Sequence, residues 1–265
     1  MTLREIERRL ARAKLAYGHG TRNAREEAAW LHSRIAVGKR LEALLERRIR
    51  ERIPLAYLLN EAWLGEHRFY IDRRAVVPRS FIAELLRERL EPWLRQAPRR
   101  ALDLCTGSGC LAILLALTFR RARVDATDLS AAALAVAAEN LARYRLGRRI
   151  RLARSDLFKS VGASRYDLIV CNPPYVTARS MRGLPKEYRY EPEMALAGGT
   201  DGLEFVKQIL NQARNHLAPD GLLVCEIGGN RRALERAYPG VEFLWPETSE
   251  GPGCVFILER GKLPP

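Results

Sequence analysis

The strongest constraint on the fold is the alternation of short apolar segments with helical spacing over the C-terminal two thirds of the chain. We expect strands at 101–105, 124–127, 150–153, 166–171 and 222–227, and helices at 109–119, 130–144 and 203–217. This alternation is typical of an α/β fold in which a mostly parallel sheet carries helices on both faces. The last apolar segments, 241–244 and 254–258, have no helix between them. We therefore expect an antiparallel edge hairpin that turns at Gly251-Pro252-Gly253.

The first fifty residues differ, because apolar side chains recur there at helical spacing with charges between them. We expect a small bundle of short helices, one of them capped by Asn23. Aromatic and β-branched residues around Gly65 predict a hairpin over 61–72, and Ser80 is expected to cap a helix over 82–94. The predicted domains are 1–52 for the helices, 53–97 for the hairpin and connecting helix, and 98–265 for the sheet.

Charge and cysteine usage limit the class of protein. The formal net charge of +14 favours a partner rich in phosphate or carboxylate, such as nucleic acid or a ribosomal particle, although solvated arginines would give the same total. The five cysteines form no CxxC pair, so we expect reduced thiols in a cytoplasmic protein and no structural metal. The N-terminus lacks the apolar core of a signal peptide, and no apolar stretch is long enough to span a membrane.

A glycine-rich loop, Gly107-Ser108-Gly109, lies between the first predicted strand and its helix. Glycines there let the backbone approach a ligand, and Asp128 at the end of the next strand could accept hydrogen bonds from two ribose hydroxyls. The same spacing satisfies the dinucleotide fingerprint, so the loop alone leaves a nicotinamide enzyme, a methyltransferase and a tight turn open. Asp103 and Asp156 also lie at strand ends. Asp103 could orient the loop or approach the amino acid portion of a cofactor, and Asp156 would lie level with an adenine ring.

The tetrapeptide Asn172-Pro173-Pro174-Tyr175 follows the fourth strand. Its proline pair makes the turn rigid, so the Asn172 side-chain oxygen and the Pro173 carbonyl can accept both hydrogens of one NH2 group. Tyr175 offers a ring face to a planar amide or base. With no His or Cys placed for a covalent intermediate, alignment and charge stabilisation remain for the protein to supply. This pattern predicts methylation of a planar amide or amine nitrogen by S-adenosylmethionine.

Three motifs together carry a family resemblance, which covers nearly the whole chain. They are Asp103-Leu104-Cys105-Thr106-Gly107-Ser108-Gly109, Ser155-Asp156-Leu157-Phe158 and Asn172-Pro173-Pro174-Tyr175-Val176. The combination resembles the class I protein-glutamine methyltransferases of the PrmB/HemK family, which have a Rossmann-like sheet. The segments 56–63 and 77–80, with Cys105, resemble the PrmB type, which modifies the third large-subunit ribosomal protein. The chain departs from that type at Phe81, where Pro is expected, and at 251–254, where Gly-Gly-Asp-Gly is usual.

The resemblance implies a site, a cofactor and a partner. The residues implied to bind S-adenosylmethionine, which leaves as S-adenosyl-L-homocysteine, are Asp103, Cys105, Thr106, Gly107, Ser108, Gly109, Asp128, Leu129, Asp156, Leu157 and Asn172. Those implied to bind or methylate the acceptor amide are Asn172, Pro173, Pro174 and Tyr175. The N-terminal helices would help to recognise a large-subunit ribosomal protein, near ribosomal RNA, and the long loop 176–202 would act as a cover. No metal is implied.

Four alternatives stay open on the sequence. Within the same family, the acceptor could be the Gly-Gly-Gln glutamine of peptide-chain release factors. The same tetrapeptide also serves enzymes that methylate an exocyclic amine of DNA or RNA. The glycine loop allows a nicotinamide dehydrogenase, and the basic charge allows a ribosome-binding module without activity.

Overall fold

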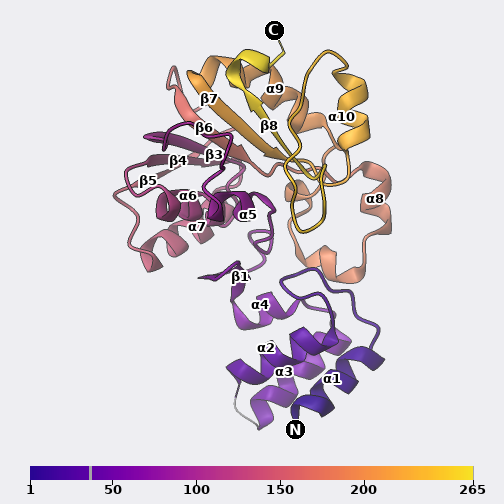
Figure 1. The fold of residues 1–265 in the computed structure, drawn as a ribbon. Helices are drawn as coiled ribbons and strands as arrows, with labels where there is room; N and C mark the ends of the chain where they lie inside the picture. The colour runs from indigo at the N-terminus through magenta and orange to yellow at the C-terminus, as the bar shows by residue number, and fades with distance from the viewer. Residues whose placement is uncertain (36–37, 265) are drawn as a thin grey trace. The chain divides into compact units, whose positions relative to one another are not determined.

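The computed structural model describes residues 1–35 and 38–264, which divide into two compact units (Figure 1). The N-terminal unit consists of Met1–Arg79 together with Leu184–Pro192. The sheet unit consists of Ser80–Gly183 and Glu193–Pro265. The N-terminal unit therefore takes in a short piece of chain from the middle of the sequence.

The N-terminal unit is a helical bundle with a short hairpin. Its elements are α1 (Leu3–Arg12), α2 (Ala24–Arg34), α3 (Lys39–Arg50), α4 (Leu55–Leu59), β1 (Ala62–Leu64), β2 (His67–Phe69) and the 3-10 helix η1 (Lys186–Tyr190). The α2 cap is the predicted one, since the Asn23 side chain accepts a hydrogen bond from the Glu26 backbone at 2.9 Å. Apolar faces of α1, α2 and α3 form one buried cluster that includes Leu10 and Leu45. The predicted hairpin is also present, with Gly65 at its turn.

The sheet unit has six strands in the order β5-β4-β3-β6-β7-β8. They are β3 (Arg100–Leu104), β4 (Arg123–Asp128), β5 (Ile150–Arg154), β6 (Tyr166–Cys171), β7 (Leu217–Glu226) and β8 (Val255–Glu259). Its helices are α5 (Ile82–Arg87), α6 (Cys110–Thr118), α7 (Ala131–Arg143), α8 (Ala178–Gly183), α9 (Glu204–His216) and α10 (Arg231–Ala237), with 3-10 helices η2 (Glu193–Ala195) and η3 (Arg260–Lys262). The first five strands are parallel, and β8 runs antiparallel to β7 at the edge, so the predicted fold class is confirmed.

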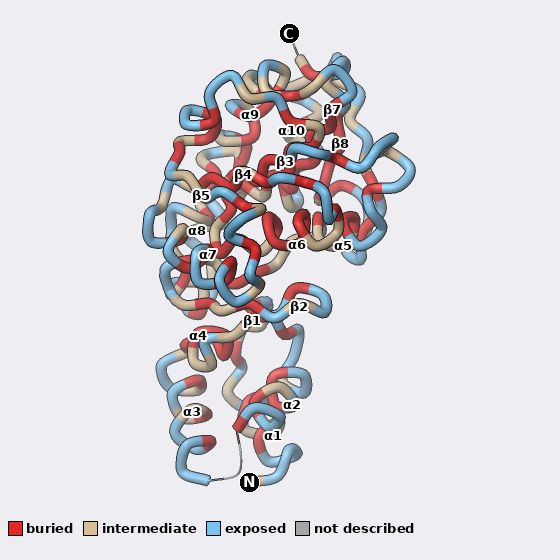
Figure 2. The backbone as a smooth tube through the Cα atoms, turned by 90° about the vertical axis from the view of Figure 1, so that its left-hand side faces the viewer, coloured by how far each residue is buried: buried red, intermediate tan, exposed pale blue. Residues whose placement is uncertain are grey.

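The order of the strands determines where a ligand can bind. From β3 the chain builds outward through β4 to β5, and then returns to β6 on the other side of β3. Open α/β sheets bind their ligands at the carboxyl ends of the strands at such a reversal. Figure 1 shows α6 and α7 on one face of the sheet and α9 on the other, and the strands between them are largely buried (Figure 2).

Two expected elements differ from the structure. Segment 241–244 forms no strand; it contributes one bridge, from Leu244 to Ile257, while β8 pairs along β7. Within this segment the Phe243 N–H donates to the Val241 carbonyl at 3.2 Å, and the neighbouring β8 ends at Glu259, so the pairing goes no further. The helix expected over 82–94 ends at Arg87, since Pro92 follows closely and cannot continue a helix. Ser80 does not cap that helix as its N-cap residue, although its Oγ accepts a hydrogen bond from the Ile82 backbone at 3.2 Å.

No helix in the described part of the chain combines the length and apolar character that a membrane crossing needs.

Candidate active site

The loop after β3 lies at the predicted position and has a tight conformation. Cys105, Gly107 and Gly109 have φ angles of 56°, 55° and 79°, in the left-handed region. A Cβ on Gly109 would come within 3.1 Å of the Cβ of Ala137 on α7, a tight contact, and the left-handed φ adds to the preference for glycine. Cys105 has no such freedom, and its left-handed backbone is strain of the kind that gathers at functional sites. The loop leads directly into the N-terminus of α6 at Cys110.

The side chain of Asp103, near the end of β3, forms hydrogen bonds to this loop and to the start of α6. Its side chain is fully buried, and Oδ2 accepts hydrogen bonds from the Thr106 hydroxyl and from the Ala112 backbone, the latter at 2.9 Å. Burial raises the pKa of Asp103 to about 7. The other oxygen, Oδ1, is buried without a hydrogen-bond partner among the described residues. Of the two roles expected for Asp103, the structure shows the one that orients the loop.

Asp128 joins the ends of β4 and β3. Its Oδ2 accepts a hydrogen bond from the Gly107 backbone and its Oδ1 one from the Ser130 backbone, both at 2.8 Å. Burial raises the pKa of this carboxyl. Each carboxylate oxygen has a further lone pair for a ligand hydroxyl. The next residue, Leu129, is 46% exposed although it is apolar, so a flat group could cover it.

Of the residues that follow β5, Leu157 is buried and Asp156 lies at the surface. Leu157 is buried with a left-handed φ of 47°, and its carbonyl accepts a hydrogen bond from the Ser155 hydroxyl at 2.7 Å. The Ser155 backbone in turn donates to the Asp128 carbonyl at 2.9 Å, which ties the ends of β4 and β5 together. Asp156 instead pairs with Lys159 at 2.7 Å on the surface.

The tetrapeptide comes directly after β6, and the chain around it is closely packed. Pro173 is buried, and Asn172, Pro174 and Tyr175 are half-buried. The Tyr175 carbonyl accepts a hydrogen bond from Asn230 at 2.8 Å. Close backbone approach on the other side is shown by Gly198, where a Cβ would lie 2.6 Å from the Cα of Tyr175. The position of the tetrapeptide is thus determined by contacts with segments distant in sequence.

Several residues of this region were not predicted as site residues. The Tyr175 hydroxyl lies 3.4 Å from Oε1 of Glu226, and a Cβ on Gly228 would come within 2.8 Å of the Tyr175 ring. Asn140 of α7 is fully buried and donates to the Ser108 carbonyl at 2.9 Å. Glu226 carried a usable signal, because it is a carboxylate that ends an apolar strand, as Asp128 is. No comparable pattern marks Asn140, which lies within a helix.

The loop that was expected to act as a cover is anchored in its middle. Glu187 is buried and accepts hydrogen bonds from the Ala16 backbone at 3.0 Å and from Arg52 at 3.2 Å. Glu191 is buried too and forms a two-pronged ion pair with Arg79. Burial alone would raise the pKa of Glu191, but its hydrogen bonds and attraction to Arg79 lower that pKa to about 2. Residues 184–192 are therefore an integral part of the N-terminal unit, held by buried ion pairs.

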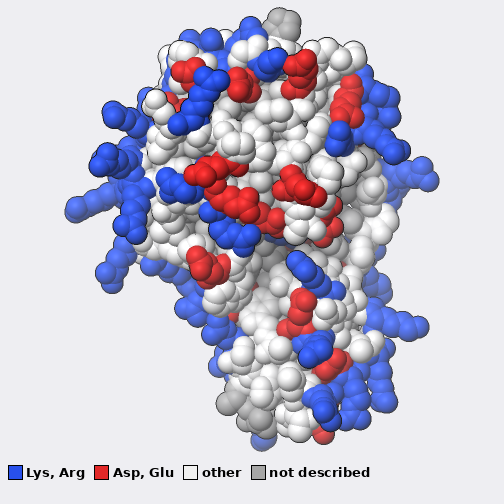
Figure 3. Space-filling model, viewed as in Figure 1, with Lys and Arg blue, Asp and Glu red and all other residues white. Residues whose placement is uncertain are grey.

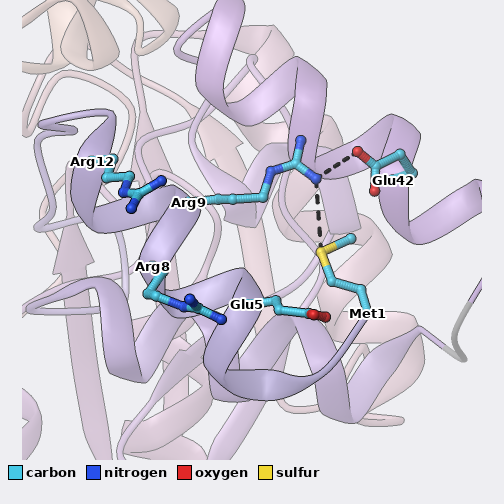
Figure 4. Close-up of a pocket in the computed structure, with 6 residues that line it drawn as sticks. All are labelled: Met1, Glu5, Arg8, Arg9, Arg12 and Glu42. Carbon is cyan, nitrogen blue, oxygen red and sulfur yellow. Dashed lines mark hydrogen bonds and ion pairs between the residues drawn. The ribbon is translucent and has the colours of Figure 1, made fainter.

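The N-terminal unit has a hollow of its own, of about 310 Å³ (Figure 4). It is lined by Met1, Glu5, Arg8, Arg9, Arg12 and Glu42. Figure 4 shows Arg9 directed toward Glu42 and the Met1 sulfur, to which it makes hydrogen bonds. None of the residues predicted for the site lines this hollow. Among the residues described, no group of His, Cys, Asp and Glu could hold a metal ion.

Comparison with solved structures agrees with the fold. The chain is similar to the hMettl16 catalytic domain in complex with MAT2A 3'UTR hairpin 6, with a TM-score of 0.58 at 18% identity over 87% of this chain and 91% of that one. It is also similar to a methyltransferase from Pyrococcus furiosus, with a TM-score of 0.52 at 20% identity over 72% of this chain and 88% of that one. At these identities the likeness concerns the fold alone.

Comparison of sequences gives the family. The methyltransferase small domain family model matches residues 82–184. The chain is 48% identical to the ribosomal protein uL3 glutamine methyltransferase of Bordetella pertussis, covering 99% of this chain and 96% of that protein. It is 47% identical to the protein of the same name from Neisseria meningitidis serogroup B, covering 99% of this chain and 94% of that protein. The chain is a methyltransferase and belongs to the ribosomal protein uL3 glutamine methyltransferase family.

Proposed function

We propose that this enzyme transfers a methyl group from S-adenosylmethionine to the side-chain amide nitrogen of a glutamine in ribosomal protein uL3. The observation that carries the proposal is the juxtaposition at the strand reversal: the tetrapeptide follows β6, and the glycine loop follows the adjacent β3. The relatives' name supports the choice of uL3 over release factors. Membership of this family also leaves no support for a dehydrogenase or for a module without activity.

The residues around the loop fit S-adenosylmethionine. Asp128 has free lone pairs for the two ribose hydroxyls, and the exposed Leu129 with the buried Leu157 offers apolar surface for the adenine. The buried Oδ1 of Asp103, which has no hydrogen-bond partner among the described residues, leaves a polar atom close to the loop. When bound, this cofactor supplies a methyl group on a sulfonium, which is a good leaving group. Asp156 is a weaker candidate, because Lys159 already holds it.

The protein has to compensate for a weak nucleophile. An amide nitrogen shares its lone pair with its carbonyl, so it attacks slowly unless it is aligned and its developing positive charge is stabilised. In our proposal, the Asn172 side-chain oxygen and the Pro173 carbonyl accept the two N–H groups and so provide both effects. Pro173 and Pro174 fix the backbone of these acceptors. Tyr175 then lies against the plane of the amide.

Replacing Asn172 tests the proposal at its centre. We expect Asn172→Ala to lower kcat on isolated uL3 by roughly 100-fold or more, because the amide loses an acceptor that aligns it. Asn211→Ala, on the exposed side of α9, is the matched control and should keep wild-type activity. The measurement is transfer of a labelled methyl group, with intact-mass analysis of the product.

The same assay separates the acceptors. Wild-type enzyme is offered uL3, a peptide-chain release factor, and RNA or DNA in parallel. Methylation of uL3 alone, at a glutamine, is the expected result. Methylation of the release factor without uL3 would overturn the substrate assignment, and label in nucleic acid would overturn the assignment to an amide.

A further inference from the structure

Glu226 is a buried carboxylate at the carboxyl end of β7. The tetrapeptide follows the carboxyl end of the parallel neighbour β6, so both lie at the same edge of the sheet. Its exposed fraction is 1%. Its Oε2 accepts a hydrogen bond from the Ser80 hydroxyl at 2.6 Å and one from the Phe81 backbone at 2.9 Å. Its Oε1 faces the Tyr175 hydroxyl at 3.4 Å. One side chain thus connects the start of α5 with the tetrapeptide.

The turn that follows Glu226 also encloses Tyr175. Gly228 has a φ of 53°, and a Cβ there would lie 2.8 Å from Cε2 of the ring, so the backbone packs directly on the ring. Asn230 donates to the Tyr175 carbonyl at 2.8 Å. The β7–α10 turn therefore contacts this tyrosine at its ring, its hydroxyl and its carbonyl.

We infer that Glu226 is a positioning residue for methyl transfer, which sets the ring plane of Tyr175 against the acceptor amide and is itself held by Ser80 and Phe81. The inference rests on the proposed function and deepens it. It also gives Ser80, at the end of the segment 77–80 that resembles the PrmB type, a place in the site.

The chemistry of a carboxylate suits this task. An ionised carboxylate only accepts hydrogen bonds, and its partners here, a hydroxyl, a backbone N–H and a phenol, can all donate. With Oε2 held by Ser80 and Phe81, Oε1 stays in one place as the target of the phenol. At 3.4 Å the Tyr175 hydroxyl lies within hydrogen-bond reach of Oε1.

Glu226→Gln tests this role, because the amide keeps the size of the side chain but replaces one acceptor oxygen with a donor. We expect kcat on uL3 to fall on the order of 10- to 100-fold, with the Kd for S-adenosylmethionine changed by less than about two-fold. Glu242→Gln is the control, since Glu242 is an exposed carboxylate paired with Lys262 in the same unit. A Glu226→Gln enzyme with wild-type kcat would overturn the inference.

A double variant shows whether Glu226 acts through Tyr175. If it does, the loss in Glu226→Gln/Tyr175→Phe falls well short of the product of the two single losses, because both changes remove the same contact. Losses that multiply would overturn the inference, and so would a Tyr175→Phe enzyme with wild-type kcat. Ser80→Ala, which keeps the carboxylate but removes one of its donors, should lower kcat by about three- to ten-fold.

A spectroscopic readout separates this inference from the proposed function. With isotope-labelled tyrosine rings, the NMR signal missing from Tyr175→Phe belongs to Tyr175. We expect that signal to shift and broaden in Glu226→Gln and in Ser80→Ala, but not in Glu242→Gln. If the Tyr175 signal is unchanged in both Glu226→Gln and Ser80→Ala, the inference is overturned. Two variants are used so that one of them still gives a result if the other folds poorly. Failure of the wild-type enzyme to methylate uL3 would instead overturn the proposed function and leave the ring signal as an independent test.

Discussion

At the scale of single residues, Asp103 is a fully buried carboxyl group that forms hydrogen bonds to the glycine-rich loop segment. A buried carboxylate is costly when it is charged, and here the bonds from Thr106 and Ala112 do not remove that cost, since the pKa stays raised to about 7. The folded protein thus holds a proton on Asp103 at pH values where the unfolded chain has lost it. The fold is therefore most stable when this carboxyl is neutral, although the bonds from Thr106 and Ala112 favour its ionised form.

This predicts a pH dependence of stability. The folded pKa of Asp103 is about 7 and the ordinary value is 3.8, so its contribution to stability is complete below the ordinary value and is lost as pH rises toward 7. Asp103→Asn has no proton to lose, so its free energy of unfolding relative to wild type should increase between about pH 4 and pH 7 and then level off. Urea unfolding of both proteins across this range measures the difference. A difference that is constant with pH would contradict the raised pKa.

Some site residues could be predicted from the sequence and others could not, for a physical reason. Asp128 and Asn172 lie at the carboxyl ends of strands, a position that local hydrophobic patterning reveals. Gly228 and Asn140 matter because of neighbours far along the chain, Tyr175 and Ser108, and no local pattern records those contacts. Asp156, expected level with an adenine, also forms an ion pair with Lys159 that the sequence alone did not reveal. The roles of the predicted residues toward the cofactor and the amide stay predictions.

At the scale of elements, periodicity was a reliable guide where packing agrees with it. Strand β6 has its predicted bounds, Tyr166–Cys171, because β3 and β7 pair with both of its edges and all of its residues except Asp167 are buried. Errors arose where local turns interrupt an element: Phe243 turns back onto Val241 within 241–244, and Pro92 follows the short α5. The anchoring of 184–192 could not be predicted, since Glu187 and Glu191 find their partners more than a hundred residues earlier.

We predict that this anchoring stabilises the N-terminal unit. In Glu187→Gln, Arg52 and the neighbouring Arg48 lose a buried negative charge, so the free energy of unfolding should fall by about 1–3 kcal/mol. The matched control is Glu193→Gln, at an exposed position in the next turn of the chain, which should change stability by less than about 0.5 kcal/mol. Urea unfolding checks both. Equal stability in the two variants would show that 184–192 is not held by Glu187.

At the scale of the whole molecule, the net charge of +14 is spread over both units. Lys and Arg side chains project around the face seen in Figure 3, with Asp and Glu among them. We propose that this charge strengthens binding of uL3 while it is associated with ribosomal RNA. Binding of Lys and Arg to the RNA phosphates releases counterions, and their gain in entropy favours the complex.

Salt should therefore distinguish two forms of the substrate. Raising the salt concentration from about 50 to 200 mM should increase KM for an RNA-bound assembly intermediate by on the order of 10-fold or more. Free uL3 is the control, and its KM should change much less because it brings no phosphates. Steady-state methyl transfer measures both. The same slope for both substrates would refute a role for RNA.

The split composition of the N-terminal unit has a consequence for synthesis. During translation, a domain commonly folds once its own residues have left the ribosome. Here Met1–Arg79 emerge long before Leu184–Pro192, and until then Arg52 and Arg79 lack the glutamates that pair with them in the finished fold. The nascent chain therefore reaches its mature N-terminal fold only after most of the sheet sequence has been made. For the same reason, grafting this unit onto another enzyme would require two separate stretches of chain to be moved together.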